Sequence, residues 1–123
     1  MVNELKAIQA YSSSRATTRT PRALEYEALA ISTRRLEAHS KIASEAFPEF
    51  AKALHDNRRL WAVFASDVLN TENPLPAETK AGIYSLALFT SQETSRILNR
   101  KGDVRNLIDI NLSVLRGLQS EAA

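Results

Sequence analysis

The feature that most constrains the fold is a regular apolar seam between residues 50 and 68. Its six positions follow one another at intervals of four, three, four, three and four residues: Phe50, Leu54, Asn57, Trp61, Phe64 and Val68. Residues at this spacing lie on one face of an α-helix, whereas a strand would alternate apolar and polar residues. No segment of the chain shows such alternation between turn residues. The seam therefore predicts a helix over about 48–69 and favours an all-α fold.

Proline and glycine are scarce, and they mark where the first two long helices begin and end. Thr20 followed by Pro21 is typical of a helix start, with a capping residue before a proline in the first turn. We expect this helix to run to about residue 46, where Pro48 breaks it or starts the next one. The segment 70–76 carries two prolines within three residues, which the interior of a helix does not accept.

Two further helices are predicted after this break. Pro76 suits the first turn of a helix that runs to about Arg100, and Asp103 is a suitable N-cap for a last helix over 104–118. Every position from Ile83 to Phe89 except one is apolar, so we expect the third helix to be central and packed from more than one side. The last helix carries two apolar rows and is also expected to be buried on two sides.

Four long helices with short connections predict an all-α, up-and-down helical bundle. The length of 123 residues fits a single domain, which we place at 21–120. The preceding arm is 1–20, in which residues 3–10 have the pattern of a short helix. Residues 1–22 hold four basic residues and one acidic residue. The rest of the chain has twelve basic and thirteen acidic residues. The arm either meets RNA phosphates or an acidic partner, or is a solvated tail.

Several function classes find no support in the sequence. The chain has no cysteine, which excludes disulfides and thiolate zinc sites, and it has no glycine-rich phosphate loop. Its two histidines, His39 and His55, lie on polar helix faces away from any nucleophile. We therefore expect a protein that is not an enzyme and has no metal or cofactor. No apolar stretch approaches the ~20 residues of a membrane span, and the N-terminus lacks the apolar region of a secretory signal.

The most informative residues are polar groups inside apolar stripes. Asn57 interrupts the seam of the second long helix, and Asn111 interrupts the stripe of the last helix. A buried amide without a partner costs a few kcal/mol, so each should form hydrogen bonds. Either the two amides contact each other or nearby backbone and fix the bundle register, or one of them binds a partner. Asp67 and Asp109 lie at stripe edges, where pairing with a nearby arginine is the structural alternative.

Trp61 and Phe64 are the largest anchors on the second long helix. They either fill the core or line a groove in which a partner helix docks, if the seam is open at one end.

Two separated motifs resemble the FlaF family of flagellar biosynthesis regulators from alphaproteobacteria. The first motif is NRRLW at 57–61, followed by Asp67 and by the NPLP break at 73–76. The second is LIDIN at 107–111, followed by the Gly-Leu pair at 117–118. The segment 20–30, TPRALEYEALA, also fits, so the resemblance covers most of 20–118. One departure is Lys80, where the family has arginine, and it matters only if that arginine pairs with a carboxylate.

The resemblance implies a cytoplasmic protein needed for flagellin production and export. Its expected partner is flagellin, which it would hold as an export chaperone and positive regulator, and the regulator FlbT is a second candidate partner. The alternatives are a post-transcriptional regulator that acts with FlbT on flagellin mRNA, and a structural adaptor of the assembly machinery. Direct nucleic-acid binding is not favoured, because the body of the chain carries no net positive charge. The candidate partner-binding residues are Asn57, Arg58, Arg59, Leu60, Trp61, Phe64, Asp67, Leu75, Asp109 and Asn111.

Overall fold

The computed structural model describes residues 21–122, which form four helices and, within that range, no strand. The helices are α2 (Pro21–Ser40), α3 (Phe47–Leu69), α4 (Ala77–Leu98) and α5 (Val104–Ala122). The predicted all-α fold is confirmed. The basic arm and the short helix expected at 3–10 lie outside the described residues. None of the described helices is long and apolar enough to cross a membrane.

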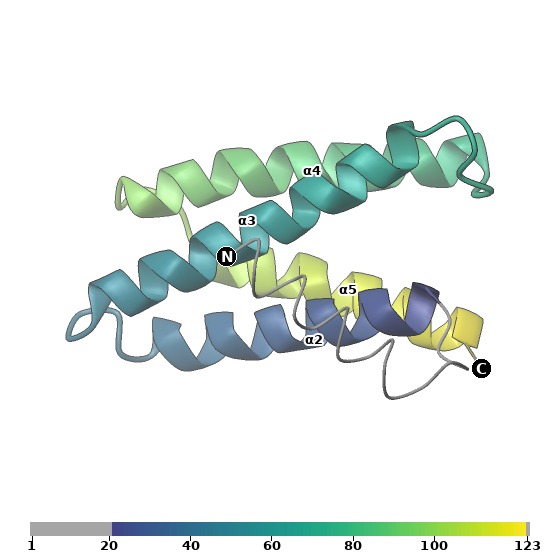
Figure 1. Ribbon diagram of the computed structural model, residues 1–123. Helices are drawn as coiled ribbons and strands as arrows, with labels where there is room; N and C mark the ends of the chain where they lie inside the picture. The colour runs from purple at the N-terminus through teal and green to yellow at the C-terminus, as the bar shows by residue number, and fades with distance from the viewer. Residues whose placement is uncertain (1–20, 123) are drawn as a thin grey trace.

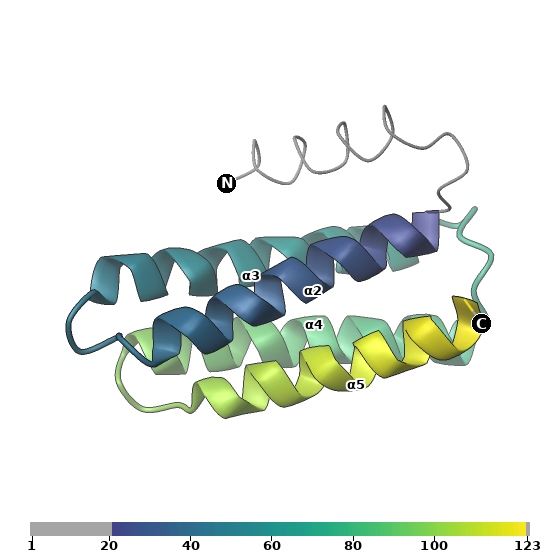
Figure 2. The same ribbon diagram turned by 90° about the horizontal axis from the view of Figure 1, so that it is seen from below.

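The four helices run alternately in opposite directions and form a ring in the order α2, α3, α4, α5 (Figures 1 and 2). Each helix therefore packs against two neighbours, and α3 lies diagonally opposite α5. The contact between α3 and α4 is the most extensive, and the contact between α4 and α5 is the least extensive. The start of α2, the end of α3, the start of α4 and the end of α5 share one end of the bundle (Figure 1). We call this end the open end.

The first long helix is shorter than predicted. α2 ends at Ser40 rather than near residue 46, and residues 41–45 form turns. The chain tightens here because Ile42 N–H donates to the His39 carbonyl and Ala43 N–H donates to the Ser40 carbonyl, three residues back. The side chain of Ile42 is 41% exposed, so the apolar stripe of α2 does not continue through this segment. Without a buried face to extend, the helix gains little from further turns.

The break at 70–76 is built by asparagine side chains. Asn70 Oδ1 accepts a hydrogen bond from the Glu72 N–H at 2.9 Å, and Asn73 Oδ1 accepts one from the Leu75 N–H at 3.0 Å. The side-chain Nδ2 of Asn73 also donates to the Asp67 carbonyl at 3.1 Å. These Asx turns satisfy the backbone where Pro74 and Pro76 prevent a helix. The motif residues of this loop therefore have a structural role.

α4 ends in a Schellman motif whose left-handed residue is not glycine. Arg100 has a φ of 62°, and its N–H donates to the Ile97 carbonyl at 2.9 Å. The next N–H, of Lys101, donates to the Arg96 carbonyl at 2.8 Å. α5 then begins at Val104, and the predicted cap is confirmed because Asp103 Oδ1 accepts from the Arg105 N–H at 2.8 Å.

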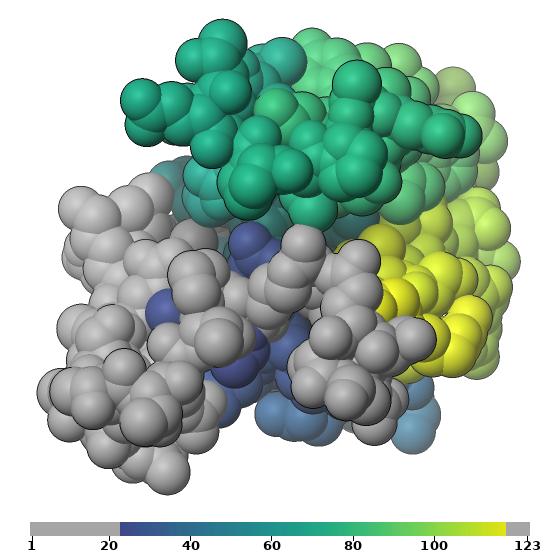
Figure 3. Space-filling view, turned by 90° about the vertical axis from the view of Figure 1, so that its right-hand side faces the viewer, coloured from purple at the N-terminus to yellow at the C-terminus, as the bar shows by residue number. Residues whose placement is uncertain are grey.

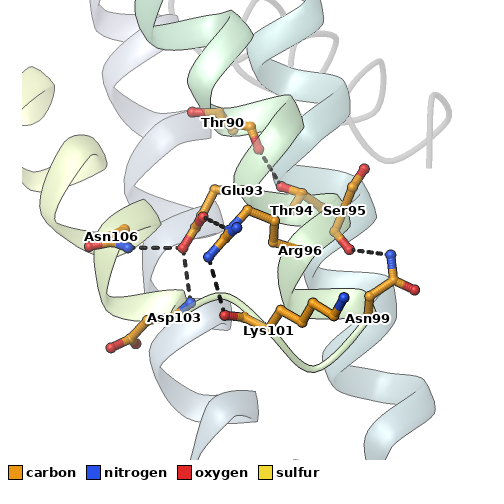
Figure 4. Close-up of polar contacts among 9 residues, drawn as sticks. All are labelled: Thr90, Glu93, Thr94, Ser95, Arg96, Asn99, Lys101, Asp103 and Asn106. Atoms are coloured by element: carbon orange, nitrogen blue, oxygen red, sulfur yellow. Dashed lines mark hydrogen bonds and ion pairs between the residues drawn. The ribbon is translucent and has the colours of Figure 1, made fainter.

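The buried carboxylate of Glu93 joins α4 to the start of α5 (Figure 4). Its Oε2 accepts from the Asp103 N–H and from Asn106 Nδ2, both at 2.9 Å, and Arg96 Nε lies 3.2 Å from Oε1. The Asp103 N–H and the Asn106 amide, helped by the Arg96 charge, lower the pKa of Glu93 against the opposing effect of burial. A negative charge at this place also suits the positive end of the α5 dipole.

The core consists of two apolar clusters. We call the end of the bundle opposite to the open end the closed end. The closed-end cluster has seven buried residues from α2 to α5: Leu36, Phe50, Ala53, Leu54, Ile97, Leu107 and Ile108. The open-end cluster has only five buried residues from α2, α3 and α4: Ala28, Leu29, Leu60, Trp61 and Ala87. Between the clusters, each helix contributes at least one buried polar residue. This buried polar layer consists of Ser32, Asn57, Thr90, Thr94 and Asn111.

α4 is not the central helix that its apolar stretch predicted. It occupies a corner of the ring, and its outward side chains Tyr84, Leu88 and Phe89 are 37%, 50% and 41% exposed. A four-membered ring offers each helix two neighbours, so a helix that is apolar all round must leave one face uncovered. The expectation for α5 fits better, because Leu107 and Ile108 are buried and it packs against both α2 and α4.

Candidate partner-binding surface

The two asparagines singled out in the sequence meet in the middle of the bundle. Asn111 Nδ2 donates to Asn57 Oδ1 at 2.8 Å, and the Trp61 indole N–H donates to Asn111 Oδ1 at 2.9 Å. Ser32 from α2 also donates to Asn57 Oδ1, at 2.9 Å. Of the two alternatives for the amides, mutual hydrogen bonding is therefore the one found. These bonds connect three helices and fix their relative heights.

The predicted partner-binding residues divide into three groups by exposure. Four are buried, namely Asn57, Leu60, Trp61 and Asn111; Arg58, Phe64 and Leu75 are half-buried; and Arg59, Asp67 and Asp109 are exposed. A buried residue contacts a partner only if the bundle opens. Moreover, α3 and α5 are diagonal in the ring, so a surface that includes both of them must pass over α2 or α4.

The charged members of the predicted set are only partly brought together. Arg58 Nη1 donates to Ser95 Oγ at 3.1 Å, and this bond links α3 to α4. Arg58 Nη2 lies 3.0 Å from His55 Nδ1, within α3. Among the described residues, neither Asp67 nor Asp109 forms an ion pair. The interhelical ion pair of this region instead joins Arg35 of α2 to Asp56 of α3 at 2.7 Å.

An incompletely covered set of apolar residues lies at the open end. Seven apolar side chains from three helices pack on the open-end cluster but remain half-buried. One is the small Ala65, and we call the six larger ones the open-end strip: Phe64, Ile83, Leu86, Ile110, Val114 and Leu115. They pack against the open-end cluster and stay partly accessible, and α4 and α5, which carry five of the six, share the least contact of the neighbouring helices. Figure 3 looks onto this end, with α3 and α4 in teal and green above and α5 in yellow beside them.

Phe64 anchors the α3 side of the open-end strip. Its ring packs edge-on against the buried Trp61 indole, with 5.3 Å between the ring centroids and an angle of 81° between the planes. The contributions of Ile83 and Leu86 from α4 were missed by sequence reasoning, because α4 is apolar on every side and its pattern does not distinguish an inner from an outer face. The signal that could have found Ile110 and Val114 is the apolar row of α5 to which they belong, at spacings of three, four and four residues: Leu107, Ile110, Val114 and Leu118.

The chain matches the model of the family described as flagellar protein FlaF over residues 7–118. A match over nearly the whole chain shows that it belongs to this family, and it is therefore a flagellar protein. The match also reaches into the arm, which the two sequence motifs did not cover. No curated protein and no solved structure matches the chain.

Proposed function

We propose that this flagellar protein binds flagellin in the cytoplasm, as an export chaperone and positive regulator of flagellin synthesis and secretion. The observation that carries the proposal is the open-end strip, six half-buried apolar side chains on a protein of the FlaF family. Half-exposed apolar side chains at inward positions are what an amphipathic helix of a partner covers when it docks on a bundle. Binding of this kind needs no catalysis and no cofactor.

The arrangement of the core supports a binding surface at this end. The closed-end cluster has more buried residues, and the bonded amides of the buried polar layer hold the helices together beside it. The open-end cluster has fewer buried residues, and α4 and α5 share the least contact of the neighbouring helices. A docked flagellin helix would complete the apolar packing that these two helices leave unfinished.

Charge favours a protein partner over RNA as the primary one. In residues 23–123, twelve basic residues are balanced by thirteen acidic residues, so the bundle has no net positive field to attract phosphates. Arg58, the inner of the two arginines in the NRRLW motif, is engaged with Ser95 and His55.

The test is size-exclusion chromatography with light scattering, on the protein alone and mixed with flagellin. We expect a complex of defined stoichiometry that survives ~0.3 M salt, because screening at that ionic strength leaves little long-range charge attraction. Val114→Lys places a charge in the open-end strip and should abolish the complex. Ser113→Lys places the same charge on the adjacent, exposed position of α5 and should not. Circular dichroism confirms that both variants remain helical.

If the two proteins elute independently, direct chaperoning is refuted. Salt-dependent binding of flagellin mRNA, or binding of FlbT, would then identify the regulatory role instead.

A further inference from the structure

The outward face of α4 carries no charge over three turns. From Ala81 to Gln92 the sequence AGIYSLALFTSQ contains no ionisable group except a tyrosine, in a chain of which 24% of the residues are charged. Eight residues of this stretch are exposed, Gly82 and Ser91 among them, and the other six form the α4 outer face: Ala81, Tyr84, Ser85, Leu88, Phe89 and Gln92. Ala81, Ser85, Leu88 and Gln92 follow the i, i+4, i+7, i+11 spacing of a single stripe. This face is separate from the open-end strip.

Two opposite charges flank the face symmetrically. Glu78 is exposed before it, and Arg96 follows it. Arg96 Nε pairs with Glu93 of its own chain at 3.2 Å, but the Arg96 side chain remains 61% exposed. They are eighteen residues apart, which is about five helical turns, so both lie on the same side of α4 and about 27 Å from each other. The midpoint between them, residue 87, nearly coincides with the middle of the uncharged stretch.

We propose that a second copy of this chain binds to the α4 outer face, with the two α4 helices antiparallel about a two-fold axis near Ser85 and Leu88. In this arrangement the uncharged stretches cover each other, and Glu78 lies beside Arg96 of the partner subunit. The symmetry repeats this ion pair at the other end. A parallel arrangement would instead bring like charges together, Glu78 to Glu78 and Arg96 to Arg96. The charge pattern therefore selects both the partner and the direction.

The test uses the absence of cysteine from the chain, which makes single introduced thiols unambiguous. Ser85→Cys and Leu88→Cys lie near the proposed axis and should each form a disulfide-linked dimer on mild oxidation. Ala81→Cys and Gln92→Cys should not link to themselves, because symmetry places each about 16 Å along the helix from its copy. Mixed together, these two variants should cross-link to each other. Self-linking at 81 and 92 would overturn the antiparallel arrangement.

Sedimentation equilibrium of the full chain gives the second readout. The wild type should have twice the mass of the 13.7 kDa chain, and Leu88→Lys should have the mass of one chain. Leu69→Lys is the matched control, since Leu69 is 66% exposed at the end of α3 and lies outside the face. It should remain dimeric. A wild type that is monomeric up to its solubility limit, or a dimer that Leu88→Lys leaves intact, would refute the proposal.

Discussion

The side-chain amide of Asn111 donates to the side-chain oxygen of Asn57 at 2.8 Å, between helices that lie diagonally across the bundle. The two residues are 54 positions apart in the chain. Both are fully buried, and Trp61 completes the arrangement by donating to Asn111. A slip of either helix would separate the amides and leave polar groups unbonded in the core, so the pair specifies one register.

Replacing Asn111 should therefore be costly. Asn111→Ala leaves the Trp61 N–H without its acceptor, removes one of the two donors to Asn57 Oδ1, and opens a small cavity. We expect the free energy of unfolding to fall by about 2–4 kcal/mol. Urea denaturation measures this loss. Asn99→Ala is the control, because it removes only an exposed hydrogen bond from the Asn99 side chain to the Ser95 carbonyl. Its free energy of unfolding should fall by less than about 1 kcal/mol. Equal losses in the two variants would contradict the role of the buried pair.

Gly102 is required for space rather than for its backbone conformation. A Cβ at this position would lie 2.9 Å from Glu93 Oε2 and 3.0 Å from both Arg96 Cβ and Ile97 Cγ1. The Glu93 carboxylate has little freedom to move away, because two hydrogen bonds hold that oxygen. Gly102→Ala should thus destabilise the fold by about 1–3 kcal/mol.

Gly117 provides the matched control for this substitution. It lies within α5, and a Cβ there would meet no heavy atom within 4 Å. Gly117→Ala should stabilise the helix by about 0.5–1 kcal/mol, so thermal unfolding should shift in opposite directions for the two variants. A shift in the same direction would show that the crowding around Gly102 is relieved without cost.

The Glu93 carboxylate should make stability depend on pH in the acid range. Its folded-state pKa is lowered from the ordinary value of 4.5 by the bonds from Asp103 and Asn106 and by Arg96. The ionised form is therefore favoured by folding. Its contribution is fully present above about pH 4.5 and is lost as the pH falls through the lowered pKa.

Glu93→Gln removes this titration and measures the contribution. The variant should be less stable than the wild type at neutral pH, and the difference between their free energies of unfolding should narrow below about pH 4.5. Chemical denaturation at a series of pH values gives both curves. Parallel curves down to pH 2 would contradict the assignment.

The seam of α3 was sufficient to predict that helix, and the position of Asn57 within it predicted the amide pair. The prediction succeeded because a polar group buried in an apolar stripe is costly without a hydrogen bond, and Asn111 was the other amide found inside such a stripe. The same reasoning failed for α4, whose apolar residues lie on every face. Periodicity then cannot distinguish the side that meets the core from the α4 outer face, which three exposed residues, Tyr84, Leu88 and Phe89, show to be uncovered.

The candidate site was predicted less well than the fold. The NRRLW motif drew attention to Leu60 and Trp61, which lie in the core, whereas Ile83 and Leu86 of the open-end strip belong to a helix without a motif. Which apolar residues remain half-exposed depends on which helices pack together. The periodic pattern of a single helix does not reveal its neighbours. The end of α4 shows the same limit: Arg100 adopts the left-handed conformation, and the glycine two residues later is needed for close packing instead.

The most direct test of the central claim is hydrogen–deuterium exchange of the full chain with and without flagellin. We expect slower exchange on binding at 83–86 of α4 and 110–115 of α5, where the open-end strip lies, with residues 50–54 at the closed end unchanged. Protection confined to other segments, or none in the presence of saturating flagellin, would contradict the claim that flagellin binds at the open end of the bundle.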